Sequence, residues 1–298
     1  MKQFDIIGRS KIWFTLSGIL VIASVAALLV YGLNLGIDFT GGSLLDVRFY
    51  EAVQTNDVEV SVSELGHTVL VQATDENGFL IRMETIDQEQ HDAVLEALAS
   101  VGSFEELRFE SVGPVIGEEL KRASLWAVAL LLALIVLYVA WAFRKVSEPV
   151  ASWKYGVLTI VAAAHDVIIP VGIFAVLGHL SGYQVDTAFI AALLTILGYS
   201  INDTIVIFDR TRENLTSNRH SDATFAQTVN KSVVQSFARS INTSLTTLLV
   251  LVAIFLFGGE TTKPFILALI IGVVSGAYSS IFLASPLLVW WEGKGTRN

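Results

Sequence analysis

The stretch that decides the fold runs from Leu197 to Asn214 and reads LGYSINDTIVIFDRTREN. It begins inside an apolar run, residues 185–208, that is long enough to cross a bilayer. Asn202 and Asp203 lie inside that run, and a dense cluster of polar residues follows it. A carboxylate near the centre of a membrane costs at least ~2.5–3.5 kcal/mol. Asp203 therefore indicates a functional site with a partner elsewhere in the helix bundle.

The alternative for Asp203 is a helix end that has moved toward the water. Asp203 precedes Phe208 by five residues, which is roughly 8 Å of helix at about 1.5 Å per residue. An aspartate side chain is too short to reach water over that distance. We favour the functional interpretation and keep the helix end as the alternative.

The composition predicts a membrane protein with several spans. Of 298 residues, 53% are hydrophobic and 16% are charged, and the mean hydropathy is +0.62. The net charge of −9 does not suggest a nucleic-acid partner, because phosphate binding needs a basic patch. The absence of cysteine excludes disulfides, thiol chemistry and cysteine-based zinc sites. No spacing of histidines suggests a metal, and we expect no cofactor.

Six apolar runs predict six transmembrane helices, with the lipid bilayer as their surroundings. Ile12–Gly32 is too long for the apolar part of a signal peptide and lacks an A-x-A-like end, so we interpret it as a retained span. The organisation that we expect is listed by residue range: cytoplasmic N-terminus 1–11, first span 12–32, extracytoplasmic α+β domain with flanking motifs 33–123, five further spans within 124–291, and cytoplasmic tail 292–298.

The segment between the first two spans has the character of a small soluble α+β domain of about 70 residues. The segment Asp87–Leu98 has the apolar spacing of an amphipathic helix. Asn56–Leu65 is ambiguous, because Val58, Val60 and Val62 alternate as they would in a strand. Alternating apolar residues predict strands at 45–50, 67–73, 79–83 and 107–112.

Two further spans carry polar residues at membrane depth. His165 and Asp166 lie in the middle of the third run and form the deepest ionisable pair of the chain. A purely structural hydrogen-bonding pair is the alternative there, but the depth favours a function. The fifth run has an unusually polar first half that includes Arg239 and Thr243.

Glycines mark two other places. Three of them surround Asp38 in the stretch Gly36–Gly42, where they permit positive φ and close backbone approach. An ordinary linker is the alternative. Gly272 and Gly276 lie four residues apart in the sixth run, which predicts close helix packing.

Together these segments resemble the signatures of the SecD/SecF family, the membrane subunits of the bacterial protein-export machinery, and specifically its SecF half. The resemblance covers essentially the whole chain in the right order. Each motif alone is weak, but five in register are specific. The matching segments are Gly36–Gly42, Val112–Leu120, Ala162–Asp166, Gly198–Asn214 and Arg239–Ser244.

The resemblance implies a six-helix half of a transporter of the RND superfamily, with a ferredoxin-like extracytoplasmic domain between helices 1 and 2. That domain type makes Asn56–Leu65 a helix, against its alternating valines. The implied role is to use the proton or sodium gradient to assist late protein translocation across the bacterial inner membrane, without enzyme chemistry. The implied partners are a SecD-like subunit, the SecYEG channel and the unfolded preprotein, with YajC or YidC as further candidates.

The resemblance also assigns an ion pathway to Asp203, Arg239 and Thr243. Asp203 and Arg239 lie at matching depth on adjacent antiparallel spans, so the residues themselves favour a switchable pair. His165 and Asp166 extend this relay. The candidate hinge and motif residues are Gly36, Asp38, Gly41, Gly42, Gly113 and Pro114.

Three rival functions follow from the same buried acids. A small-molecule or lipid exporter of the RND type would normally need both halves of the transporter, and one is present. A structural scaffold would leave Asp203 without a role in transport. An intramembrane protease would need a Ser-Lys, HExxH or paired-Asp arrangement, and the chain has no lysine within a span and no HExxH.

The distribution of basic residues predicts the orientation. Of the 19 Lys and Arg residues, 13 lie in the N-terminus, the 144–154 loop, the 210–239 region and the C-terminal tail. The positive-inside rule makes these segments cytoplasmic, with both termini in the cytosol. A reporter fused at residue 80 should therefore report an extracytoplasmic position, and a cytosolic signal there would reverse the topology.

Overall fold

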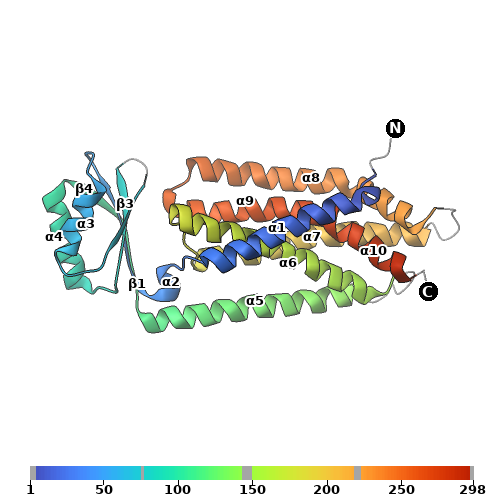
Figure 1. Cartoon of the computed structure of the whole chain (residues 1–298), viewed down its shortest axis with the longest axis horizontal. Helices are drawn as coiled ribbons and strands as arrows, with labels where there is room; N and C mark the ends of the chain where they lie inside the picture. The colour runs from blue at the N-terminus through green and yellow to red at the C-terminus, as the bar shows by residue number, and fades with distance from the viewer. Residues whose placement is uncertain (1–4, 75–76, 143–149, 218–222, 296–298) are drawn as a thin grey trace. The chain divides into compact units, whose positions relative to one another are not determined.

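The computed structural model describes residues 5–74, 77–142, 150–217 and 223–295 (Figure 1). Contacts divide the chain into two compact units. The membrane unit comprises Met1–Leu33, Ala127–Leu180 and Ala188–Asn298. The sheet unit comprises Asn34–Trp126 and the short segment Ser181–Thr187.

The sheet unit is built on a four-stranded antiparallel sheet with strand order β2-β3-β1-β4. Both of its longer helices, α3 and α4, lie on one face of the sheet (Figure 1). This order and the βαββαβ succession are ferredoxin-like, as the resemblance implied. The elements are β1 (Gly42–Phe49), α3 (Thr55–Ser63), β2 (Leu70–Ala73), β3 (Gly78–Met83), α4 (Gln88–Val101) and β4 (Phe104–Val112).

The segment with alternating valines is a helix, α3, so the strand interpretation of its pattern was wrong. Val58 and Val62 are completely buried, whereas Val60 between them is 46% exposed. Residues four apart share a helix face, and this face packs in the same core as Leu45 of β1 and Leu98 of α4. Burial against the sheet therefore overrides the local β preference of valine.

The connections of the sheet unit cross closely where they enter and leave it. The short helix α2 (Ile37–Thr40) ends at Gly41 and Gly42, whose φ angles are +74° and +126°. A Cβ on Gly41 would lie 2.9 Å from Cα of Pro114, and one on Gly42 would lie 2.8 Å from the carbonyl oxygen of Met83. The glycines thus allow a tight crossing that a side chain would block.

In the part of the chain that the structure describes, six helices are long and apolar enough to cross a membrane, which confirms the predicted number of spans. The last span contains a π-helical turn, η3. The segments are η1 (Ile7–Arg9), α1 (Ser10–Tyr31), α5 (Pro114–Ala142), α6 (Ser152–Ser181), α7 (Thr187–Ser217), α8 (Phe225–Phe257), η2 (Glu260–Thr262), α9 (Lys263–Ser279), η3 (Ser280–Ala284) and α10 (Ser285–Gly295).

Three of the six spans form the interior of the bundle. Half of the most apolar part of α6 and of α7 is buried, and 61% of that of the last span, against 11% for the first two spans. Gly272 and Gly276 allow α9 to approach α7, because a Cβ there would lie 2.2 Å from Ile196 and 2.9 Å from Ser200. The predicted close packing at these glycines is confirmed.

Parts of the charge pattern lie outside the described residues. They are the first four residues, the last three, and the loops 143–149 and 218–222. Together these segments include five of the 13 basic residues counted above. Residues 75 and 76, between β2 and β3, also lie outside the described residues, and Asn77 after them has a φ of 59°.

Replacing Gly41 and Gly42 with valine should destabilise the sheet unit while leaving membrane insertion intact. Positive φ at a non-glycine residue costs about 1–3 kcal/mol, and both side chains would collide with backbone atoms. Thermal unfolding of the purified chain in detergent measures the effect. Gly113→Ala is the control, since no atom lies within 4 Å of its added Cβ. Equal melting temperatures for both variants would refute the tight crossing.

Candidate functional site

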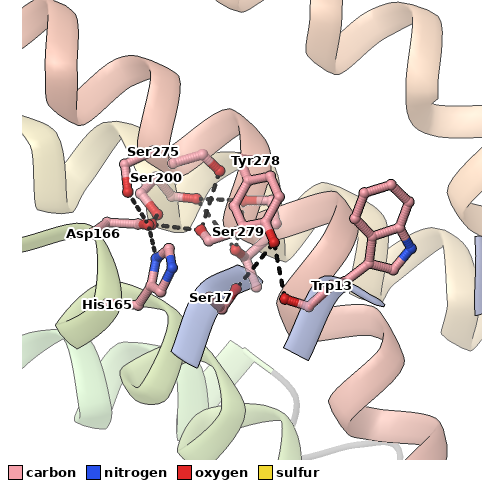
Figure 2. A network of polar contacts seen from close by, with 11 residues as sticks. Trp13, Ser17, His165, Asp166, Ser200, Ser275, Tyr278 and Ser279 are labelled. Carbon is pink, nitrogen blue, oxygen red and sulfur yellow. Dashed lines mark hydrogen bonds and ion pairs between the residues drawn. The ribbon is translucent and has the colours of Figure 1, made fainter. Parts of the chain in front are cut away.

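Asp166 on α6 is fully buried and receives hydrogen bonds from neighbouring helices (Figure 2). Ser275 Oγ donates to its Oδ1 at 2.9 Å, and Ser279 Oγ donates to its Oδ2 at 2.6 Å. Ser200 Oγ also donates to Oδ2, and His165 Nδ1 lies 2.8 Å from Oδ1. We call these five residues the Asp166 cluster. Its four partners compensate the carboxylate inside the bundle.

Helix geometry explains how the serines converge. Ser275 and Ser279 are one turn apart on α9 and share a face. Gly276 between them lets α7 come close enough for Ser200 to reach the same carboxylate. Immediately afterwards the π-helical turn begins, and Ser280 Oγ donates to the carbonyl oxygen of Ser200 at 3.3 Å. The hydroxyls are therefore held by backbone packing as well as by the acid.

The imidazole of His165 extends the cluster toward α1. Its ring stacks on Tyr278 with centroids 6.0 Å apart. The Tyr278 hydroxyl donates to the carbonyl oxygen of Trp13 at 3.0 Å and accepts from Ser17 Oγ at 3.1 Å (Figure 2). Among the described residues, His165 Nε2 is buried without a hydrogen-bond partner. Polar contacts thus join α1, α6, α7 and α9.

Asp203 on α7 is the second buried acid, and its surroundings differ. The residue is 4% exposed. Its Oδ2 is buried and finds no hydrogen-bond partner in the described part of the chain. A buried polar atom without a partner is rare in proteins and calls for a functional explanation.

Two contacts between α7 and α8 show which part of α8 lies level with this acid. Asn214 Nδ2 donates to Ser232 Oγ at 2.8 Å, and Tyr199 OH donates to Ser244 Oγ at 3.5 Å. Because the helices are antiparallel, the segment of α7 between Tyr199 and Asn214 runs alongside the segment of α8 between Ser244 and Ser232. The first segment contains Asp203 and the second contains Arg239. The depth matching expected from the sequence agrees with this register.

Arg239 and Thr243 are both exposed in the isolated chain. Among the described residues, Asp203 and Arg239 form no ion pair within 4.0 Å. Thr243 Oγ1 donates to the carbonyl oxygen of Arg239, at 2.9 Å, rather than to the acid. The buried hydroxyl of Ser240, next to Arg239, also has no partner in the described residues.

A polar pocket of about 320 Å³ opens beside this pair of helices. It begins one turn beyond Asp203, and Arg239 forms part of its wall. The other lining residues are Val206, Asp209, Arg210 and Glu213 of α7 and Gln235 and Ser236 of α8.

The ion-pathway residues expected from the sequence therefore lie in two places, one around Asp166 and one where α7 meets α8. Sequence reasoning missed the serines that bind Asp166, and their one-turn spacing at Ser275 and Ser279 was the available signal. The described residues contain no group of three or more His, Asp or Glu side chains placed to hold a metal ion.

This architecture defines a six-span membrane protein with an inserted ferredoxin-like domain and, in the described part of its spans, two buried acids. The family model for "Protein export membrane protein SecD/SecF, C-terminal" matches residues 93–294, and that for the "SecD/SecF GG Motif" matches residues 26–49. The chain belongs to the SecD/SecF family, and it is a protein translocase subunit of the SecF type.

Similar proteins extend over nearly the whole chain. The protein translocase subunit SecF of Thermobaculum terrenum is 42% identical over 98% of this chain and 95% of that protein. The SecF of Anaerolinea thermophila is 39% identical over 99% of this chain and 96% of that protein. A crystal structure of SecDF from Thermus thermophilus, described as a translocon-associated membrane protein, matches with 36% identity and a TM-score of 0.86. The match covers 98% of this chain and 39% of that longer protein.

Replacing Asp166 with alanine should destabilise the bundle strongly. Three buried hydroxyls and an imidazole would lose their acceptor, and each unsatisfied group costs about 1–3 kcal/mol. The melting temperature of the full chain in detergent measures the loss. Asp209→Ala is the matched control, because Asp209 is exposed and pairs only with Arg212 on its own helix. If both variants have the same melting temperature, the cluster does not stabilise the bundle.

Proposed function

We propose that this chain, with a SecD-like partner, uses an ion gradient to assist late translocation of unfolded preproteins through the SecYEG channel. The setting is the bacterial cytoplasmic (inner) membrane, with both termini in the cytosol. The chain contributes ion-coupled movement and no hydrolytic chemistry of its own. The observation that carries the proposal is the buried carboxylate oxygen of Asp203, which finds no hydrogen-bond partner among the described residues.

The two buried acids support different roles. The carboxylate of Asp166 is surrounded by four polar partners, and changing its charge would leave all of them poorly matched. Asp203 keeps one oxygen open. In this proposal Asp203 binds and releases the ion, whereas His165 and Asp166 position the helices around it rather than extend the relay.

Arg239 makes the charge of Asp203 switchable. Burial disfavours a lone carboxylate, and a nearby guanidinium favours it. When a proton or a sodium ion neutralises Asp203, the attraction to Arg239 is lost and α7 and α8 are free to shift. Thr243 offers a hydroxyl one turn from Arg239, and the pocket beyond Asp203 supplies a polar route to the ion site.

The exposed polar face of α8 supports a partner in the membrane. Arg239, Asn242, Thr243 and Thr246 are exposed in the isolated chain although they belong to a spanning helix. The two threonine hydroxyls donate to carbonyl oxygens of their own helix, but lipid tails cannot satisfy the charge of Arg239 or the side-chain amide of Asn242. A SecD-like subunit would cover this face, and the SecDF of Thermus thermophilus, 37% identical over 98% of this chain, carries both names in one protein. YajC or YidC are further candidates for the complex.

Asp203→Asn should abolish the stimulation of translocation by an imposed ion gradient and leave ATP-driven early translocation intact, because only the ionisable step is lost. Arg239→Met should behave in the same way. The double variant should be no worse than either single one, since both residues serve one step. The measurement is preprotein translocation into membrane vesicles that contain the complex, with and without a gradient.

Asp57→Asn is the matched control, because it makes the same chemical change at an exposed position that lies outside the pocket and outside the proposed ion pathway. It should retain the full response to the gradient. A full response in the Asp203→Asn variant would show that Asp203 is structural. In that case the Asp166 cluster would become the candidate for the coupling site.

A further inference from the structure

The segment before α7 belongs to the sheet unit although the helices on both sides of it belong to the membrane unit. This segment, Ser181–Thr187, joins α6 to α7, and its contacts place it with the sheet unit. We call it the α7 lead. Its position poses a physical question, because a loop between two spans needs no specific attachment to a domain inserted between two other spans.

The first attachment is a short parallel pairing with the chain that follows α1. Gly36 N donates to the carbonyl oxygen of Val185 at 2.8 Å, and Val185 N donates to that of Asn34 at 2.8 Å. Leu35 and Val185 form a parallel β-bridge between these bonds. A Cβ on Gly36 would lie 3.3 Å from Cβ of Asp186, so the glycine allows the two segments to approach.

The second attachment is the carboxylate of Asp38. Its Oδ2 accepts from Thr187 N at 2.9 Å and from Thr187 Oγ1 at 2.5 Å. Thr187 is the first residue of α7. A carboxylate that accepts from the first amides of a helix stabilises its N-terminus. Asp38 therefore caps a helix that begins 149 residues later in the chain.

The third attachment comes from the sheet itself. Gln72 on β2 donates through Nε2 to the carbonyl oxygen of Ser181 at 3.1 Å. Arg82 on β3 fixes this amide, because its Nη1 donates to Gln72 Oε1 at 3.1 Å. The α7 lead is thus held at its start by the sheet and at its end by Asp38.

We propose that these three attachments form a grip through which the sheet unit moves α7, with Asp38 and Gln72 as positioning residues for ion coupling. The inference rests on the function proposed above. α7 continues without interruption from Thr187 to Asp203, a distance of about 24 Å at ~1.5 Å per residue. A continuous helix transmits a displacement of its first turn along its length, so movement of the sheet unit and the state of Asp203 become linked.

Removing the grip should uncouple the gradient from translocation. Asp38→Ala, and Asp38→Ala combined with Gln72→Ala, should lower the gradient-stimulated component on the order of fivefold and leave ATP-driven translocation unchanged. Asp87→Ala is the matched control. Asp87 also caps a helix of the sheet unit, since its Oδ1 accepts from Gln90 N at 3.0 Å, but it does not touch the α7 lead. Equal effects of Asp38→Ala and Asp87→Ala would overturn the proposal.

A structural readout separates this proposal from the proposed function. The chain has no cysteine, so Leu35→Cys with Val185→Cys introduces a single pair whose disulfide reports the parallel pairing. Oxidation in membranes should form this disulfide in high yield. Adding Asp38→Ala should lower the disulfide yield, whatever the role of Asp203. The locked pair should also retain the gradient response of the reduced form. If the disulfide abolishes the gradient response and reduction restores it, the pairing must open during the transport cycle. That result would overturn the proposal.

Discussion

The structure of the bundle depends on the compensation of one carboxylate. Asp166 is completely inaccessible in the interior of the bundle, where no water can solvate it, so the chain must bring donors to both of its oxygens. Four side chains from three helices do so. That requirement fixes how closely α9 approaches α7 and explains why glycine stands at Gly276. The most buried spans of the protein are the spans that supply these donors.

Asp203 shows the opposite solution to the same problem. It lies on one of the helices that meet at Asp166, yet one of its oxygens finds no donor among the described residues. Arg239, the charge proposed to compensate it, lies on an exposed helix face. A fully compensated acid is locked, whereas an incompletely compensated acid responds to an added ion. In the function proposed above, the two acids thus divide stability and responsiveness between them. The exposed charge also means that the environment of the site is completed by whatever covers α8.

Much of this arrangement was predictable because its causes are local. Apolar runs set the spans, and alternation set the strands of the small domain. Asp203 and Arg239 were found because a charge in an apolar run is conspicuous. The alternating valines at Asn56–Leu65 wrongly suggested a strand. The segment is a helix because packing against the sheet, rather than local alternation, determines its structure.

Other features could not be read from the chain. Serines are common in apolar helices, so the one-turn spacing of Ser275 and Ser279 was too weak a signal to show that they converge on Asp166. Their role depends on a packing distance that two glycines set, which sequence spacing alone does not specify. The capping of α7 by Asp38 joins residues so far apart that no local pattern could indicate it.

That separation also bears on how the protein is made. Thr187 is synthesised only after the inserted domain and the whole of α5 and α6, so Asp38 has no helix to cap when the domain first leaves the ribosome. The domain can fold around its own core before this time, but its attachment to α7 must wait until two more spans have been inserted. The early part of the chain therefore passes through a stage in which the finished domain is tethered only by α1 and α5. The hydrogen bonds to the α7 lead then mark the completion of membrane insertion up to the fourth span.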